Sequence, residues 1–417
     1  MKKITITNAY TWYNKGDAGI LLGIVETLKK IYNNEVEVDI LSFTPNEDEK
    51  RYCKDKTIKN IYSNVLNPHP YKHTKIGKII AIIKLFFSMI FQLIMVNFSK
   101  KLLINKYDNY RLLNDSDCII VCGGGFLGGK KFDSFMHLFQ IYINTKFSQK
   151  VIIMGISIEP ISNKIVKRIT EKILKRVDYI YAREVITFDY LKSFLPKNKF
   201  ELIPDMAFML PDIKEDNFQV EQWKKEYKYI YGLTVRRWNF PGENNGKKLF
   251  ENYKKELVKF IEYKAKLDNS LFVFIPQVIV DYGNDVDVAK EIRKMLDDKY
   301  KNNFIIIEKD IHPNEIKSLI WNFDYFIGTR MHSNIFATSM LIPTIAIAYE
   351  KKTNGIMHTV ELDDYILEMN KLKFEDLKKV SEKQIKNNKK IKRNLEKRIT
   401  EIRKEIFEKI NKKIKEV

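Results

Sequence analysis

Residues 324–348 read DYFIGTRMHSNIFATSMLIPTIAIA. The apolar runs Asp324–Gly328 and Thr344–Ala348 predict two short buried strands. Between them, a predicted helix begins around Ser333 and continues through Ala337. A strand, a helix and a second strand in this order are typical of a parallel α/β unit. The stretch therefore places this part of the chain in the α/β class.

The same alternation of apolar runs and helical patterns continues on both sides of this stretch. Further strands are predicted at Ile4–Asn8, Val36–Phe43, Cys118–Cys122, Val151–Ile156, Tyr179–Ala182, Tyr229–Val235, Ser270–Pro276 and Phe304–Ile307. Helices such as Gly19–Tyr32 and Ile165–Arg176 end in basic residues, which suit the carboxyl end of a helix dipole. We therefore expect parallel α/β architecture over most of the chain.

Chain length and one polar segment predict the domain organisation. A chain of 417 residues exceeds what one hydrophobic core usually organises. Because Pro211–Lys228 is polar and weakly patterned, we place a boundary there. We predict an N-terminal domain over residues 1–215, a C-terminal domain over 228–368 and a basic amphipathic helical tail over 369–417. The apolar positions of the tail could pack on the domains or lie on lipid, and the sequence leaves both open.

Composition excludes several classes of protein. The chain is 45% hydrophobic and 12% aromatic, so it has ample material for packed cores and is not disordered. Its three cysteines cannot form a disulfide framework, and no Cys/His group has the spacing of zinc ligands. The N-terminus lacks the apolar region of a signal peptide. We therefore expect a cytoplasmic protein without a metal site.

The net charge of +20 is concentrated in two blocks. Residues 371–417 hold 18 basic and 8 acidic side chains, and residues 56–107 hold nine lysines and no acid. Both blocks need a negatively charged partner or a solvated surface. No aromatic and basic motif for nucleic-acid bases is present, so we expect no nucleic-acid partner.

Residues 79–98, IIAIIKLFFSMIFQLIMVNF, reach the length of about 20 residues that a membrane span needs. A span would place strands of one predicted sheet on opposite sides of a bilayer. Lys84, Ser88 and Gln92 instead give a helix one polar stripe. Lysines flank the segment: Lys72, Lys75, Lys78, Lys100, Lys101 and Lys106. We predict an insertion over about 72–106 that lies in the interface of an anionic membrane; the alternative is a buried core helix.

Asn14-Lys15-Gly16-Asp17 follows the first predicted strand, where doubly wound sheets bind ligands. The glycine permits close approach of the backbone. The helix dipole would favour a carboxylate at Asp17. Alternatively, Asp17 merely caps a helix that begins near Ala18.

A glycine-rich stretch, Gly123 to Gly129, follows the strand predicted at Cys118–Cys122. It contains a literal G-x-G-x-x-G, but no acidic residue lies about 20 positions further on, as a dinucleotide site requires. We therefore reject a dinucleotide site. We predict a turn whose N–H groups face an anion or a sugar, with a simple tight turn as the alternative.

The turn Gly328–Ser333 carries Arg330 and His332 at the start of a helix. Backbone donors, a guanidinium and an imidazole at one point suit a phosphate or carboxylate. The alternatives are an arginine paired with a distant acid and an incidental histidine. Arg236 and Arg237, and later Glu350 and Lys352, also follow predicted strands. Their shared place at strand ends favours a charged site.

Taken in order, these motifs resemble those of the polysaccharide pyruvyl transferase family. The matching pieces are Asn14-Lys15-Gly16-Asp17, Gly123-Gly124-Gly125, Ala182-Arg183-Glu184, Pro204-Asp205-Met206-Ala207-Phe208, Gly328–Ser333, Ala337 and Tyr349 through Lys352. The resemblance implies two Rossmann-like domains facing a cleft, similar to B-type glycosyltransferases. It also implies transfer of pyruvate from phosphoenolpyruvate to a sugar diol, which forms a cyclic ketal and releases phosphate.

The resemblance also implies site residues. Arg330 and His332 look like part of the phosphoenolpyruvate pocket, and Arg236 or Arg237 looks like its second arginine, with Lys352 beside them. We expect His332 as general acid. The other expected roles are Asp17 or Glu350 as base, and Asn14, Gly16, Asp17, Gly123, Gly124 and Gly125 as acceptor contacts.

No cofactor is expected beyond phosphoenolpyruvate as co-substrate. The apolar insertion and the basic tail are not needed for ketal formation, and they suggest a polyprenyl-diphosphate-linked acceptor at the inner face of the cell membrane. The main alternative is a glycosyltransferase of the same two-domain fold that uses a nucleotide sugar in surface glycan assembly. A non-catalytic binding protein is the third hypothesis.

Overall fold

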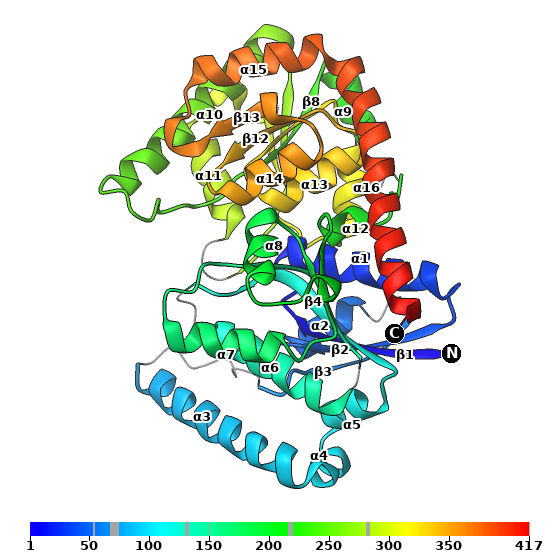
Figure 1. Cartoon of the computed structure of the whole chain (residues 1–417). Helices are drawn as coiled ribbons and strands as arrows, with labels where there is room; N and C mark the ends of the chain where they lie inside the picture. The colour runs from blue at the N-terminus through cyan, green and yellow to red at the C-terminus, as the bar shows by residue number, and fades with distance from the viewer. Residues whose placement is uncertain are drawn as a thin grey trace. The chain divides into compact units, whose positions relative to one another are not determined.

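The computed structural model describes residues 1–52, 55–66, 75–129, 133–148, 150–215, 220–280 and 284–416, without the side chains of residues 75–79, 81 and 133. Cys53, Lys72 and the side chains of Lys75 and Lys78 lie outside the described part. The chain forms two compact units (Figure 1). The first unit comprises Met1–Trp12, Ile20–Met209 and Ile406–Val417, and the second comprises Tyr13–Gly19 and Leu210–Glu405.

The first unit contains a seven-stranded sheet in the order β3-β2-β1-β4-β5-β6-β7. Its strands are β1 (Lys2–Ala9), β2 (Val36–Ser42), β3 (Ile58–Ser63), β4 (Cys118–Leu127), β5 (Val151–Ile158), β6 (Tyr179–Ala182) and β7 (Phe200–Leu202). Every pair of neighbouring strands is parallel. Strands buried on both faces are near-continuously apolar, and all eight residues of β5 are buried. The strand order reverses between β1 and β4, which makes this the topological switch point of the sheet.

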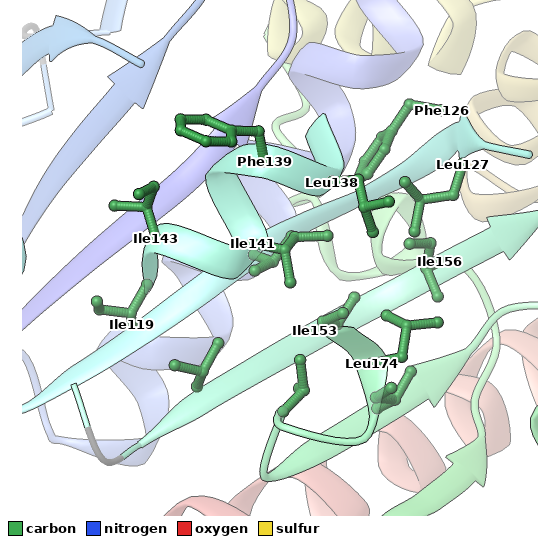
Figure 2. Packing of buried hydrophobic residues seen from close by; sticks show 14 of the residues in the cluster. Ile119, Phe126, Leu127, Leu138, Phe139, Ile141, Ile143, Ile153, Ile156 and Leu174 are labelled. Carbon is green, nitrogen blue, oxygen red and sulfur yellow. The ribbon is translucent and has the colours of Figure 1, made fainter. Parts of the chain in front are cut away.

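Helices connect these strands. They are α1 (Lys15–Ile31), α2 (Pro45–Tyr52), α3 (Lys75–Phe98), α4 (Lys100–Lys106), α5 (Asp108–Asp115), α6 (Asp133–Phe147), α7 (Lys164–Leu174) and α8 (Val185–Lys192). Figure 2 shows how α6 covers one face of the sheet: Ile141 lies near Ile153 of β5, and Leu138 lies near Leu127 and Ile156. This packing forms one contiguous core under β4 and β5.

The second unit contains a six-stranded parallel sheet in the order β10-β9-β8-β11-β12-β13. Its strands are β8 (Ile230–Thr234), β9 (Leu271–Phe274), β10 (Phe304–Ile306), β11 (Tyr325–Gly328), β12 (Thr344–Ala348) and β13 (Ile366–Glu368). Its helices are α9 (Val220–Glu226), α10 (Gly246–Asp268), α11 (Asp285–Met295), α12 (Pro313–Trp321), α13 (Met331–Ser339), α14 (Lys351–Thr359), α15 (Phe374–Lys386) and α16 (Asn388–Glu416), the last of which continues into the first unit. The predicted fold class, parallel α/β throughout with a long C-terminal helix, is confirmed.

The glycine-rich turn predicted at Gly123–Gly129 is wrong for its first part. β4 continues through Gly123, Gly124 and Gly125 to Leu127, paired with β5 across an irregularity in register. A side chain at Gly123 would meet the carbonyl oxygen of Met154 at 2.1 Å. The glycines therefore allow close approach of two neighbouring strands, and the chain turns only at Gly128.

Helix α3 forms as expected, but its polar stripe has a different orientation. Gln92 is buried: it donates to the carbonyl of Val65 (2.9 Å) and accepts from the hydroxyl of Tyr110 (2.6 Å). The polar stripe of α3 therefore lies partly on the side of the helix that packs on the first unit. Much of the apolar surface of α3 is exposed instead. No single helix in the described part of the chain is long and apolar enough to cross a membrane. The segments Ile82–Phe98 and Lys100–Lys106 qualify only together and are bent by 117°.

The C-terminal tail packs on protein. The apolar positions of α16 are buried at Ile391, Leu395, Ile399, Ile402, Ile406, Ile410 and Ile414. Residues up to Glu405 belong to the second unit and those from Ile406 to the first. The structure thus divides the predicted tail, residues 369–417, between the two units, and it places the loop Tyr13–Gly19 with the second unit.

Candidate active site

The switch point of the second sheet lies between β8 and β11. Ligands of open α/β sheets bind outside the carboxyl ends of strands at such a point. β8 ends at Thr234 and β11 at Gly328, so the residues that follow them, Arg236 and Arg330, start from the same edge of the sheet. The last residues of the two strands, Thr234 and Gly328, are directly paired.

Buried hydroxyl groups fix the turn after β11. The hydroxyl of Thr234 lies 2.8 Å from that of Ser333 and accepts the backbone N–H of Thr329 (3.1 Å). The hydroxyl of Tyr253, from α10, lies 2.8 Å from that of Thr329. Ser333 donates back to the carbonyl of Arg330 (2.6 Å). Because each of these buried groups has a partner, the start of α13 is held in one conformation.

Arg330 is held by a carboxylate that sequence analysis did not identify. Its guanidinium donates through Nε and Nη2 to Asp285, the first residue of α11, which is fully buried. The same carboxylate accepts the backbone N–H groups of Gln277 (3.2 Å) and Val278 (3.0 Å). Burial raises the pKa of Asp285, whereas the positive charge of Arg330 opposes this shift. Asp285 therefore orients Arg330 and joins the turn to the segment after β9.

The two adjacent arginines after β8 differ in their surroundings. Arg236 donates to the hydroxyl of Tyr349, and its guanidinium lies 4.3 Å from the centre of that ring and 4.8 Å from the Trp238 ring. Burial lowers the pKa of Arg236, and the charge of Arg330 acts in the same direction. Arg237 instead pairs with Glu291 at the surface. Only Arg236 therefore lies beside Arg330.

The backbone of the loop Tyr13–Gly19 packs against the imidazole of His332 at Gly16. Asn14 forms a β-bridge with Val278, and Lys15 N–H donates to the carbonyl of Gln277 (2.9 Å). A side chain at Gly16 would lie only 2.1 Å from Nδ1 of His332. Glycine is therefore required for the imidazole to lie against the first turn of α1. The sequence motif and the histidine that were predicted separately come together here.

The other residues of this loop are also held in place. α1 begins at Lys15, so the expected start near Ala18 is wrong and Asp17 lies in the first turn. The side chain of Asn14 accepts the backbone N–H of Gly16 (3.1 Å) and donates to Asp17 (2.5 Å). Lys15 is fully buried and pairs with Asp310. Asn14 is therefore the capping residue, and the half-buried Asp17 is held by it in the first turn of α1, in the same unit as His332.

The remaining predicted residues of the second unit follow β12. Glu350 precedes the first turn of α14 and Lys352 lies within it; both are half-buried. Glu350 and Arg330 both act on the pKa of Tyr349, which burial raises. Glu350 therefore lies near the arginine pair, since its charge also acts on Arg236.

The switch point of the first sheet carries a second polar cluster. Asn8, at the end of β1, donates to Nδ1 (3.0 Å) and to the carbonyl (3.0 Å) of His137 in α6, so the ring proton lies on Nε2. Burial lowers the pKa of His137 to about 3. Nε2 of His137 and Nδ2 of Asn64 are buried and have no hydrogen-bond partner among the described residues. Two donors at this point suit oxygen ligands such as hydroxyl groups.

A model of the polysaccharide pyruvyl transferase family matches residues 14–351. The chain belongs to the polysaccharide pyruvyl transferase family. A curated relative, the amylovoran biosynthesis protein AmsJ of Erwinia amylovora, is 22% identical over 379 residues, covering 87% of each chain. This family member is therefore a transferase with a role in pyruvyl transfer.

Solved structures share the fold of this transferase. UDP-GlcNAc 2-epimerase of Methanocaldococcus jannaschii is 15% identical with a TM-score of 0.57, covering 92% of both chains. A glycosyltransferase of Rickettsia africae is 14% identical with a TM-score of 0.58, covering 99% of this chain and 98% of its own. At these identities the likeness shows the architecture alone.

The sequence of this transferase did not point to Asp285 or Trp238, and it gave no role to Lys15 and Tyr349, although both lie within the matching motifs. A largely buried arginine such as Arg330 needs an acidic partner, but the sequence offers 53 acidic residues and no spacing that selects Asp285. Asp285 lies 45 positions from Arg330 and reaches it only because β9 and β11 both flank β8. No group of three metal-ligating side chains occurs among the residues that the structure describes.

Proposed function

We propose that this transferase uses phosphoenolpyruvate as donor and forms a cyclic pyruvyl ketal on a sugar diol of a surface polysaccharide, without a further cofactor. The observation that carries the proposal is the pair of arginines at the switch point of the second sheet. Arg330 is paired with Asp285, whereas Arg236 has no acidic partner in a salt bridge among the described residues. An anionic ligand is needed to balance this partly buried charge.

The phosphate and carboxylate of phosphoenolpyruvate suit this arrangement. The N-terminus of α13 supplies backbone donors and a helix dipole, and Arg236 supplies a guanidinium that lies against two aromatic rings. Lys352, in the first turn of α14, adds a positive charge. The relative AmsJ carries amylovoran biosynthesis in its name, which supports a polysaccharide as the acceptor.

In the proposed reaction, His332 donates a proton to the terminal methylene carbon of phosphoenolpyruvate. One sugar hydroxyl forms a bond to the central carbon and loses its proton to Asp17 or Glu350. The second hydroxyl then bonds to the same carbon while the bond to the phosphate oxygen breaks. Phosphate leaves with the second proton, so a methyl group and a ketal remain. Asn14 and Gly16 position the loop that carries Asp17.

Two adjacent arginines provide a matched test of donor binding. We expect phosphoenolpyruvate to raise the melting temperature of the wild type and of Arg237→Gln, but not of Arg236→Gln. Arg237 is the control because it has the same chemistry and pairs with Glu291 at the surface. An equal response of both variants would contradict the proposed site. A response to nucleotide sugars and not to phosphoenolpyruvate would favour the glycosyltransferase alternative.

Turnover tests the role of His332. With phosphoenolpyruvate and candidate sugars, bare or polyprenyl-diphosphate-linked, we expect phosphate release and an acceptor that gains a pyruvyl mass. His332→Gln should keep the thermal response to phosphoenolpyruvate and lower kcat by about 10²–10⁴-fold. A variant with near-normal kcat would remove the general-acid assignment. We also propose that the acceptor sugar is linked to polyprenyl diphosphate. A strong preference of the enzyme for the lipid-linked sugar over the bare sugar would support this.

A further inference from the structure

Helix α3 exposes a dense apolar surface. Large hydrophobic side chains that are at least one-third exposed follow one another along α3 and into α4: Ile80, Ile82, Ile83, Phe86, Phe87, Ile90, Phe91, Ile94, Phe98 and Leu102. Phe87 is 65% exposed and Phe98 85%. We call this surface the α3 face. Soluble proteins rarely expose a contiguous apolar surface of this kind unless it binds something.

The opposite side of α3 is anchored to the first unit. Val96 is 1% exposed, and Leu85, Met89 and Leu93 pack against the core under β4 and β5. Gln92 bonds to Val65 and Tyr110. The inner side of α3 is therefore packed on protein, and the α3 face is the outward side of the helix. Figure 1 shows α3 along the outside of the first unit, with α4 turning away from its end.

Sheet topology excludes a transmembrane orientation. β3 precedes α3 and β4 follows α4, and both strands belong to one sheet. The chain therefore leaves and returns on the same side of any bilayer. Helix α3 must then lie in the plane of the membrane surface, which agrees with the bend of 117° between its end and α4.

The charge around the α3 face selects its partner. Lys84 and Lys101 are exposed, and neither makes an ion pair among the described residues. Lys100 and Lys106 follow the helix break, and residues 56–107 contain no acid. A second copy of this chain would bring the same positive charge against it, whereas anionic lipid headgroups complement it.

From these observations we infer that the α3 face docks this transferase on an anionic lipid bilayer, with α3 lying in one leaflet and Lys84 and Lys101 at its headgroups. The inference goes beyond the proposed reaction and does not depend on it. That this bilayer is the inner face of the cell membrane stays a prediction from the sequence.

The test is flotation of the full chain with vesicles. We expect binding to mixed phosphatidylglycerol and phosphatidylcholine vesicles, weak binding to pure phosphatidylcholine, and release at high salt. Phe87→Ser with Phe91→Ser should weaken binding by about tenfold or more, because it removes buried apolar area. Lys84→Gln and Lys101→Gln should each weaken it by about fivefold.

Controls separate this inference from the alternatives. Ile165→Ser with Ile186→Ser removes two exposed apolar side chains of the same unit outside the α3 face, at 69% and 57% exposure, and should leave binding unchanged. The Phe87→Ser, Phe91→Ser variant should keep wild-type phosphate release with a water-soluble acceptor, so loss of binding and loss of activity are distinguishable. Absence of vesicle binding by the wild type would overturn the inference. A wild-type dimer that this variant converts to a monomer would instead identify the α3 face as a self-association surface.

Discussion

Two arginines of the second unit are held by different means, and this difference sets their roles. Arg330 is fixed by the buried carboxylate of Asp285, which neutralises its charge. Arg236 is fixed by the rings of Tyr349 and Trp238, which orient the guanidinium without neutralising it. An anionic ligand would therefore stabilise Arg236 more than Arg330. Arg330 instead holds the conformation of the turn.

Gly16 sets the position of His332, so its substitution should affect chemistry more than folding. In Gly16→Ala the new methyl group would overlap the imidazole, which lies 2.1 Å away at Nδ1, and displace it. We expect kcat to fall about tenfold to a hundredfold, because a misplaced general acid loses most of its contribution. Gly355→Ala is the control, since nothing lies within 4 Å of a methyl group there. An unchanged kcat in Gly16→Ala would contradict the assigned position of His332.

Asp48 gives the first unit a pH-dependent stability. It is fully buried, accepts from the N–H of Trp12 (3.1 Å) and the hydroxyl of Thr44 (3.1 Å), and burial raises its pKa from 3.8 to about 6. The folded state holds the proton more tightly than the unfolded state, so stability falls as pH rises from about 4 to about 6 and then levels off. At 1.36 kcal/mol per pKa unit, the loss is up to about 3 kcal/mol.

Asp48→Asn should remove this dependence. The free energy of unfolding of the variant relative to wild type should rise between about pH 4 and pH 6 and stay constant above, measured by denaturant titration at several pH values. A difference that does not vary with pH would show that Asp48 titrates normally.

At the scale of elements, sequence patterns predicted strands wherever apolar runs were long. β6 and β12 have the predicted bounds, but β3, β7 and β13 were missed, because two have only three residues and β3, IKNIYS, is too polar to stand out. The turn with Arg330 and His332 was also predictable, since its position depends only on residues adjacent in sequence. The role of Asp285 was not predictable, because its contact with Arg330 depends on the order of the strands in the sheet. The inward orientation of Gln92 on α3 likewise depends on Tyr110, a distant partner.

A buried ion pair joins α12 to the segment that enters the second unit. Lys317 is fully buried, and it donates to the carbonyl of Leu210 and to Asp212 (both 2.6 Å), which also accepts two bonds from Arg403 of α16. Burial lowers the pKa of Lys317 to about 8. The lysine therefore depends on Asp212 to remain charged at neutral pH.

Substitution of Asp212 should lower the free energy of unfolding more than substitution of Lys317. Asp212→Ala leaves an uncompensated buried ammonium and should lower the free energy of unfolding by about 3–5 kcal/mol at pH 7. The loss should be smaller at pH 9, where Lys317 is mostly neutral. Lys317→Met leaves Asp212 paired with Arg403 and should be close to neutral. Denaturant titration of both variants checks this, and equal losses would contradict the buried charge of Lys317.

At the scale of the whole molecule, neither unit is a continuous stretch of chain. The second unit takes Tyr13–Gly19 from near the N-terminus, and the first takes Ile406–Val417 from the C-terminus. The first unit therefore completes its core only with the last turns of α16. Contacts this distant in sequence slow folding. They also make the last turns of α16 a part of the fold of the first unit, and of the two alternatives that the sequence left open for the tail, packing on the domains is the one observed.

The last turns of α16 should accordingly control the stability of β6 and β7. Ile410 is fully buried, the hydroxyl of Tyr181 donates to the carbonyl of Lys409 (3.0 Å), and Lys409 donates to the carbonyl of Leu202 (2.8 Å). We expect Ile410→Ala to destabilise the first unit by about 2–5 kcal/mol through the cavity it leaves. Lys412→Ala, at an exposed position of the same helix, should change stability by less than about 0.5 kcal/mol.

Amide hydrogen exchange distinguishes the units: in Ile410→Ala the amides of β6 should exchange faster, while those of β11 and β12 keep the wild-type rate. Equal acceleration in both sheets would mean that the two units unfold together.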